Sequence, residues 1–251
     1  MKGTVVVAGA TGAVGTPLVQ QLVEAGWRVF GITRDSRRAD ALRRAGVEAL
    51  VVDVFDAPAL DAALASARPN VVVHQLTDLP RIRTPESLSA AIQRNARLRR
   101  EGTHNLVQAT RASGCQRMVA QSIAWVYAPG SLPHDEQDPL DISATGDRAV
   151  TVHAVLALET LVLNTAGVEG LILRYGQFYG PGTWAAEPEG EMPLHVEDAA
   201  YAALLAVESP GVTGLFNVSE SSRWLSVEKA RQVLGWAPRS ADRRGRSRAR
   251  E

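Results

Sequence analysis

The residues with the clearest chemical meaning form a glycine-rich segment near the start of the chain. Glycines recur at every third position, at Gly9, Gly12 and Gly15, between an expected strand at 4–8 and an expected helix at 14–25. Glycine in this arrangement lets the backbone turn tightly and approach a pyrophosphate, whose charge is stabilised at a helix N-terminus. The spacing predicts a dinucleotide-binding loop, with a purely structural tight turn as the alternative. The expected cofactor contacts in this segment are Gly9, Thr11, Gly12, Ala13, Val14 and Gly15.

Side chains after the next two expected strands should recognise the rest of the cofactor. An acidic residue at the end of the second strand usually binds a ribose hydroxyl of NAD, but this chain has Arg34 there, with two more arginines close behind. A guanidinium matches a 2′-phosphate in charge and geometry, so NADP is the expected cofactor. NAD is less favoured, although Asp35 could turn toward a ribose and the arginines could be a solvated cluster. Asp53 and Val54 are expected to face the adenine, with an ordinary strand-end aspartate as the alternative for Asp53.

These residues need a scaffold, and the hydrophobic pattern indicates one. Short β-branched runs alternate with longer amphipathic segments over the first 125 residues, which is typical of βαβ units and a parallel sheet. Strands are expected at 4–8, 28–33, 47–52, 71–74, 117–121 and 170–174. Helices are expected at 14–25, 39–45, 58–67, 88–113, 149–165, 196–207 and 226–234, with a Gly/Pro-rich loop at 176–193. The predicted fold is α/β, a Rossmann-type doubly wound parallel sheet.

Length and composition favour one domain. The chain has 251 residues, 45% of them hydrophobic, which is enough to bury one sizeable core. We expect a single domain over residues 1–238, with a small C-terminal substrate-binding lobe built mainly from 176–238. Six arginines crowd residues 239–251, so this basic tail is expected to be disordered.

The same composition narrows the possible partners. Basic and acidic residues both number 27, so nothing suggests a nucleic-acid-binding surface. No stretch of about 18 apolar residues occurs, so no membrane span or secretory signal is expected. A single cysteine, Cys115, excludes an intrachain disulfide, and the scattered histidines lack metal-ligand spacing. The sequence predicts a cytoplasmic protein that acts on a small molecule, without a metal.

Four further segments match a known superfamily in their order along the chain. They are Asp53-Val54, 102–107 in the expected long helix, 173–182 and 195–200. With the glycine loop, they resemble the short-chain dehydrogenase/reductase superfamily over residues 3–238, in its extended branch of NAD-dependent epimerases, dehydratases and related reductases. The resemblance implies a Rossmann-type sheet and a nicotinamide cofactor, but it specifies the fold more closely than the reaction.

One departure from that superfamily bears on the chemistry. Members that move a hydride use a tyrosine as the acid/base and a lysine four residues later, which lowers the tyrosine pKa and holds the nicotinamide ribose. No tyrosine in this sequence is followed four residues later by lysine. Counted back from Glu159, which resembles the end of that motif, the two positions hold Thr151 and Val155. Neither side chain can take over these roles, so an atypical active site is expected.

Three residues are candidates for a substitute acid/base. Ser122 resembles the first active-site serine of the superfamily, with a strand-end hydroxyl bonded to backbone as the alternative. Tyr127 and His153 are the nearest replacements for the missing tyrosine. Histidine titrates in a useful range, although an offset of two helical residues from Thr151 turns His153 toward another face. Arg99 stands where the superfamily has an asparagine in its proton relay, although Asn95 lies one turn away on a similar face.

The expected substrate cleft and three possible functions complete the sequence interpretation. The cleft residues implied by the resemblance are His74, Gln75, Arg174, Tyr175 and Tyr179, with Tyr175 equally suited to packing. The first function is an NADP-binding oxidoreductase or epimerase-like enzyme for a small hydroxylated or carbonyl substrate. The others are a non-redox cyclase, isomerase or dehydratase, and a non-catalytic NADP-sensing protein. A homodimer through the helices at 88–113 and 149–165 is also expected from the resemblance.

Overall fold

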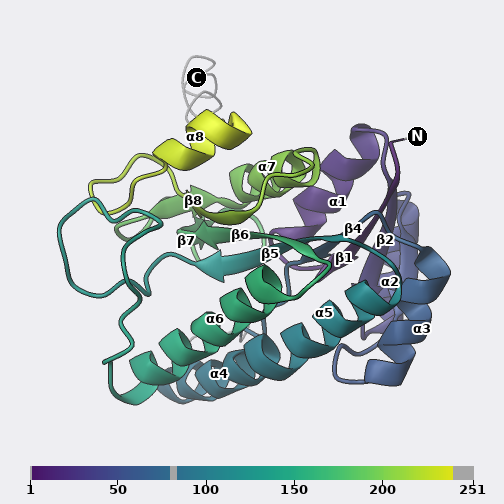
Figure 1. Ribbon diagram of the computed structural model, residues 1–251, viewed down its shortest axis with the longest axis horizontal. Helices are drawn as coiled ribbons and strands as arrows, with labels where there is room; N and C mark the ends of the chain where they lie inside the picture. The colour runs from purple at the N-terminus through teal and green to yellow at the C-terminus, as the bar shows by residue number, and fades with distance from the viewer. Residues whose placement is uncertain (1, 80–83, 240–251) are drawn as a thin grey trace.

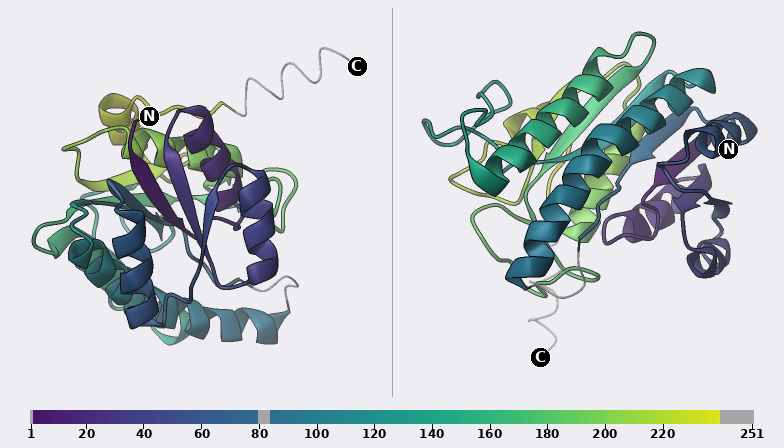
Figure 2. Two further views of the ribbon diagram at one scale, coloured as in Figure 1. Left: turned by 90° about the vertical axis from the view of Figure 1, so that its right-hand side faces the viewer. Right: turned by 90° about the horizontal axis from the view of Figure 1, so that it is seen from below.

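The computed structural model describes residues 2–79 and 84–239, in which a seven-stranded parallel sheet lies between two layers of helices (Figures 1 and 2). The strands, in spatial order, are β3 (Glu48–Val51), β2 (Arg28–Thr33), β1 (Thr4–Ala8), β4 (Val71–His74), β5 (Arg117–Ile123), β6 (Glu169–Tyr175) and β9 (Gly214–Val218). The helices are α1 (Gly15–Glu24), α2 (Ser36–Arg44), α3 (Ala57–Ala67), α4 (Pro85–Arg97), α5 (Thr103–Ala112), α6 (Gly146–Asn164), α7 (Val196–Val207) and α8 (Glu228–Leu234). The doubly wound fold expected from the sequence is confirmed.

Both faces of the sheet are buried, which explains why its central strands are apolar throughout. Val5 and Val7 of β1 pack into a core formed with α1, α2, α7 and α8, and Val6 and Ala8 pack into the opposite core with α3, α5 and α6. Alternate side chains of a strand point to opposite faces, so a strand covered on both sides has no polar face.

The order of the strands places the glycine loop at a crevice in the sheet. The chain turns outward in one direction from β1 to β2 and β3, and in the other direction from β4 onward, so the carboxyl ends of β1 and β4 flank the point of reversal. Ala8 is paired with His74 across these strands, and the Gln75 amide donates to the Ala8 carbonyl at 2.8 Å. Ligands of open parallel sheets bind at such a reversal.

Most elements agree with the sequence prediction, and the differences are informative. The expected helix at 88–113 is interrupted, because α4 and α5 are joined by a π-helical turn, η1 (Leu98–Gly102). The expected loop at 176–193 contains a short strand, β7 (Gln177–Tyr179), which pairs with β8 (Pro193–His195). The segment β9, which the hydrophobic pattern did not indicate as a strand, completes the main sheet beside β6.

Residues 176–238 therefore contribute to more than one part of the molecule. Within them, α7 packs against α1 and β9 joins the central sheet, while β7 and β8 form a separate small sheet. A substrate-binding role for this segment stays a prediction. The expected tail lies outside the described residues from 240 onward. No helix in the described part of the chain is both long and apolar enough to span a membrane.

Candidate functional site

The glycine loop has the shape that a pyrophosphate requires. Gly9 has a φ of +88°, and a Cβ there would lie 2.5 Å from the Gln75 carbonyl oxygen. A Cβ at Gly15 would lie 2.0 Å from the Gly9 carbonyl oxygen, whereas a Cβ at Gly12 would meet only that oxygen, at 3.3 Å. Gly9 and Gly15 thus let the turn close, and Gly12 leaves open space at the start of α1. A dinucleotide phosphate group fits this cradle.

Arg34 and Arg38, which follow β2, differ in their hydrogen bonds. Asp35 caps α2 by accepting from the Arg37 amide at 2.9 Å, and this hydrogen bond lowers the pKa of its carboxyl group. Arg38 Nη1 donates to the Thr11 hydroxyl of the glycine loop at 3.4 Å. Arg34 is exposed and makes no hydrogen bond or ion pair within residues 2–79 and 84–239. The Arg38 guanidinium therefore lies at the glycine loop, while the nearby carboxylate is occupied with capping.

The turn after β3 and the loop after β7 form the remaining surroundings of the expected cofactor site. Asp53 accepts from the Phe55 amide at 3.0 Å, so its carboxylate stabilises the turn after β3. Val54 is buried, and its carbonyl accepts from Asn105 of α5 at 3.0 Å. A Cβ at Gly182 would lie 3.4 Å from the Ala13 Cα, so the loop after β7 lies against the glycine loop.

A buried polar cluster joins β5, α6 and β6 beside the crevice. Glu159 Oε1 accepts from the Ser122 hydroxyl at 2.7 Å and from Arg174 Nε at 2.8 Å, while Oε2 accepts from Arg174 Nη2 at 2.6 Å. Arg174 Nη1 donates to the Tyr127 hydroxyl at 2.9 Å, and that hydroxyl donates to Asn217 Oδ1 at 2.7 Å. Ser122 and Arg174 are register partners in the parallel β5–β6 pair, which sets their spacing.

Burial and charge shift the pKa values of Arg174 and Tyr127 in this cluster. Burial lowers the pKa of Arg174, but the hydrogen bonds and charge of Glu159 outweigh burial and raise it overall. Burial raises the pKa of Tyr127 more than the Arg174 charge lowers it. The Tyr127 phenol therefore stays protonated near neutral pH. The Ser122 and Tyr127 hydroxyl groups donate hydrogen bonds to Glu159 and Asn217, so the cluster holds both groups in defined orientations.

The expected cleft residues are buried and engaged with one another or with the fold. His74 Nδ1 accepts from the Leu76 amide at 3.2 Å, so its Nε2–H donates to the Thr103 hydroxyl at 2.9 Å. Burial, with a further contribution from the Arg99 charge, lowers the pKa of His74 to about 4, which keeps the ring neutral. Gln75 Nε2 donates to the Tyr175 hydroxyl at 3.3 Å.

Both remaining tyrosines of the expected cleft have defined partners. The Tyr175 hydroxyl donates to the Ala199 carbonyl at 3.1 Å, its ring packs against Phe178, and burial raises its pKa. The Tyr179 hydroxyl donates to Glu220. Tyr175 is fully buried, in agreement with the alternative prediction that its side chain packs in the core.

The structure does not bring His153 into the polar cluster. His153 is exposed on α6, whereas Val152 and Val155 of the same helix are buried against Ile123 and Val126. Thr151 donates to the Asp147 carbonyl one turn earlier. Of the three acid/base candidates, the structure therefore groups Ser122 and Tyr127 and leaves His153 on the outer face of α6.

In the sequence analysis Glu159 served only to align a motif, and its position at the centre of the cluster was not predicted. The sequence nevertheless indicates a buried ion pair. Glu159 is the one carboxylate between residues 148 and 164, a largely apolar helix, and Arg174 is the one charged residue of the apolar run from 170 to 175. Buried charges are rare without a partner, so two lone opposite charges on neighbouring elements favour an ion pair.

Together, the reversal of strand order, the phosphate loop and the adjoining polar cluster define a Rossmann-type dinucleotide-binding protein. The chain belongs to the NAD dependent epimerase/dehydratase family, whose sequence model matches residues 5–215. Membership implies a nicotinamide cofactor and oxidoreductase or epimerase chemistry, and it confirms the superfamily resemblance read from the motifs. The preference between NADP and NAD does not follow from it.

Two curated proteins are similar to this chain. One, from Streptomyces sp, is named 3-diazoavenalumate denitrifying reductase and is 42% identical over 88% of this chain and 79% of its own length. The other, from Caulobacter vibrioides, is named ceramide reductase and is 27% identical over 95% of this chain and 73% of its own length. Both names describe reductases.

Solved structures share the fold at lower sequence identity. UDP-glucose 4-epimerase from Thermotoga maritima, with UDP-glucose, superposes with a TM-score of 0.76 at 19% identity, covering 94% of each chain. The Bordetella bronchiseptica enzyme WbmG, in complex with NAD, gives a TM-score of 0.74 at 19% identity, covering 95% of this chain and 90% of its own. At this identity the likeness establishes the fold alone.

Replacing Glu159 by glutamine should destabilise the protein strongly, because Arg174 would keep a buried charge without its counter-charge. Breaking one side of a buried ion pair costs about 3–5 kcal/mol. The matched control is Glu48→Gln, since Glu48 and its partner Arg28 are both about half exposed and lie 2.6 Å apart, a type of pair worth about 0–1 kcal/mol. Urea unfolding measures both variants. Equal free energies of unfolding for the two would contradict the role assigned to the Glu159–Arg174 pair.

Proposed function

We propose that this protein is an NADP(H)-dependent reductase that removes a diazo group from a small aromatic substrate. The observation that carries the proposal is an intact phosphate loop beside a polar cluster whose hydroxyl protons are already donated within the protein. Reduction of a carbonyl group produces an alkoxide that must be protonated, and this site has no tyrosine–lysine pair to supply the proton. A substrate that needs no proton at the reduced group suits such a site.

A diazo group meets that requirement. Bound reduced nicotinamide would supply one hydride, and an aryl diazonium group that takes up a hydride loses dinitrogen, leaving a C–H bond where the C–N bond was. The hydride brings both electrons and neutralises the positive charge, so no acid is consumed. The name of the 42% identical relative, 3-diazoavenalumate denitrifying reductase, supports this chemistry.

The residues proposed to hold the cofactor are those of the glycine loop and the following strand ends. The backbone from Gly9 to Gly15 would bind the pyrophosphate, and Asp53 with Val54 would border the adenine. Arg34 and Arg38 would bind the 2′-phosphate, because each can form a charge-assisted hydrogen bond with it. The capping role of Asp35 removes the carboxylate that would favour NAD.

The remaining site residues are assigned to positioning and to the walls of the cleft. Ser122 and Tyr127 hold Glu159 and Arg174 in place, and the buried ion pair keeps water out of the base of the site. The loop after β7, which lies against the glycine loop, would cover a bound substrate. His153 has no part in this proposal, because it faces outward on α6.

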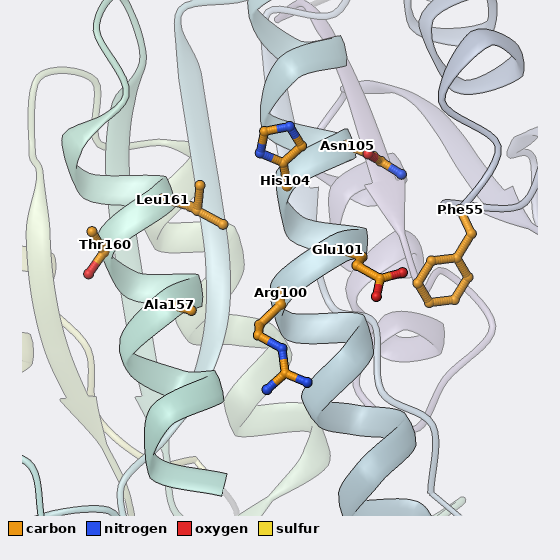
Figure 3. A pocket seen from close by; sticks show the side chains of 8 residues that line it. All are labelled: Phe55, Arg100, Glu101, His104, Asn105, Ala157, Thr160 and Leu161. Carbon is orange, nitrogen blue, oxygen red and sulfur yellow. The ribbon is translucent and has the colours of Figure 1, made fainter. Parts of the chain in front are cut away.

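A groove between α5 and α6 supports a homodimer. It has a volume of about 660 Å³ and is lined by Phe55, Arg100, Glu101, His104, Asn105, Ala157, Thr160 and Leu161 (Figure 3). On the outer face of α6, Leu156 is 40% exposed. Light scattering should give about twice the 26.9 kDa chain mass for the wild type and one chain mass for Leu156→Glu. A monomeric wild type at micromolar concentration would contradict the dimer.

Fluorescence titration with NADPH and NADH tests the cofactor assignment. Arg34→Ala should weaken NADPH binding about 10- to 100-fold and leave NADH binding unchanged, because only the 2′-phosphate contact is lost. Gly12→Ala should weaken both nucleotides, since its methyl group fills the phosphate cradle. Arg44→Ala removes an exposed arginine from the far end of α2 and should change neither affinity. Equal loss of both nucleotides in Arg34→Ala would overturn the preference for NADP.

The reaction itself is tested with a ¹⁵N-labelled aryl diazonium compound that carries no ionisable hydroxyl group. The wild type should oxidise one NADPH for each labelled dinitrogen released, as measured by NADPH absorbance and gas mass spectrometry. The Gly12→Ala variant, deprived of cofactor, should release no dinitrogen above the uncatalysed rate. NADPH oxidation without dinitrogen, or no oxidation by the wild type, would contradict the proposed reaction.

A further inference from the structure

The loop that follows β4 forms one wall of the crevice at the reversal of strand order. It starts at Gln75, whose amide donates to the Ala8 carbonyl at the end of β1 at 2.8 Å. A Cβ at Gly9 would lie 2.5 Å from the Gln75 carbonyl oxygen, so this loop and the glycine loop are in contact. A dinucleotide that crosses the crevice therefore passes beside residues 75–79.

A buried asparagine on α4 holds the far end of this loop. Asn95 is only 6% exposed. Its Oδ1 accepts from the Asp78 amide at 3.0 Å, and its Nδ2 donates to the Asp78 carbonyl at 2.8 Å. Nδ2 also donates to the Ala91 carbonyl, one turn earlier on α4, at 2.9 Å. The Asn95 amide thus pairs with both backbone groups of Asp78 and ties the loop to the helix.

These contacts use both N–H donors of the Asn95 side chain. A side-chain amide has two such donors, and here one binds the Asp78 carbonyl and the other binds the Ala91 carbonyl. The asparagine that the superfamily uses in its proton relay would stand at Arg99, one turn further along. Because neither N–H group of Asn95 is left to hold a water molecule, its geometry suits the fixing of backbone and not the passing of protons.

The loop has few other attachments at this end. Thr77 is exposed, and in the part of the chain that the structure describes its amide and the Leu76 carbonyl form no hydrogen bond. The Asp78 carboxylate lies 3.4 Å from Arg94, but both side chains are partly exposed, and such surface pairs contribute little. Asn95 is therefore the strongest constraint on the position of this end of the loop.

We infer that Asn95 is a positioning residue for the nicotinamide half of the cofactor. This inference rests on the proposed function, in which residues at the ends of β2 and β3 bind the adenine half. A dinucleotide spans both halves of a doubly wound sheet, so the half that carries the hydride lies on the β4 side. By fixing Asp78, Asn95 holds residues 75–78 against the glycine loop, where they form the wall for that half.

Nucleotide binding by Asn95 variants tests the inference. Asn95→Ala should weaken NADPH and NADH by the same factor, about 10-fold, because both contain the nicotinamide half. Adenosine 2′,5′-bisphosphate, which contains only the adenine half, should bind with wild-type affinity. Asn95→Asp keeps the side-chain volume but loses both N–H donors, so it should give the same pattern even if Asn95→Ala fails to fold. Fluorescence titration measures the reduced cofactors, and calorimetry measures the bisphosphate.

Two variants control for a general loss of stability. Asn70→Ala removes a side-chain hydrogen bond to backbone, the one from the Thr4 amide at 2.8 Å, at the amino edge of the sheet. Arg94→Gln breaks the surface ion pair with Asp78 at the residue next to Asn95. Neither variant should change the affinity for any of the three nucleotides.

Three results would overturn the inference. Wild-type affinity for NADPH and NADH in the folded Asn95 variants would contradict it, and so would equal losses for the bisphosphate and the whole cofactors. A wild type that binds neither cofactor would contradict the inference and the proposed function together. Because binding is measured without turnover, the first two results would contradict the role of Asn95 alone and leave the proposed reaction standing.

Discussion

The buried ion pair between Glu159 and Arg174 is the interaction on which the site depends. Taking two charges out of water costs several kcal/mol per ion, so the pair persists only if its remaining oxygens and N–H groups are satisfied. Ser122 accordingly donates a hydrogen bond to one Glu159 oxygen, and the Tyr127 hydroxyl accepts one from Arg174 Nη1. The pair thereby links β5, α6 and β6, and it engages the Ser122 and Tyr127 hydroxyl groups in hydrogen bonds within the protein.

Cofactor binding and the proposed reaction therefore depend on different parts of the protein, namely the backbone of the glycine loop and the side chains of the polar cluster. In the proposed function, cofactor binding depends on backbone geometry at Gly9, Gly12 and Gly15. The proposed reaction depends instead on side chains at the carboxyl ends of β5 and β6, which form an ion-paired cluster with Glu159. A dehydrogenase-like scaffold can in this way retain hydride delivery while favouring substrates that need no proton at the reduced group.

Much of the fold and the cofactor loop could be predicted because their signals are local. The glycine spacing, the β-branched runs and the helix at 196–207 each follow from neighbouring residues, and the structure has them at the expected places. The ion pair was missed because its partners, Glu159 and Arg174, meet only after α6 packs on β6. The π-helical turn has no local signal, since one inserted residue does not disrupt the apolar pattern, and the three-residue strands of the small sheet are too short for a period of two to emerge.

In the proposed reaction, the hydride reaches the substrate without a protein proton donor. The most direct test is the single-turnover rate of NADPH oxidation by the wild type, with an aryl diazonium substrate that carries no ionisable hydroxyl group, between about pH 7 and 9. We expect a rate independent of pH, because the raised pKa of Tyr127 keeps its phenol protonated while the hydroxyl donates a hydrogen bond to Asn217. A rate that falls as pH rises through a single apparent pKa in this range would reveal a protein acid and contradict the proposed reaction.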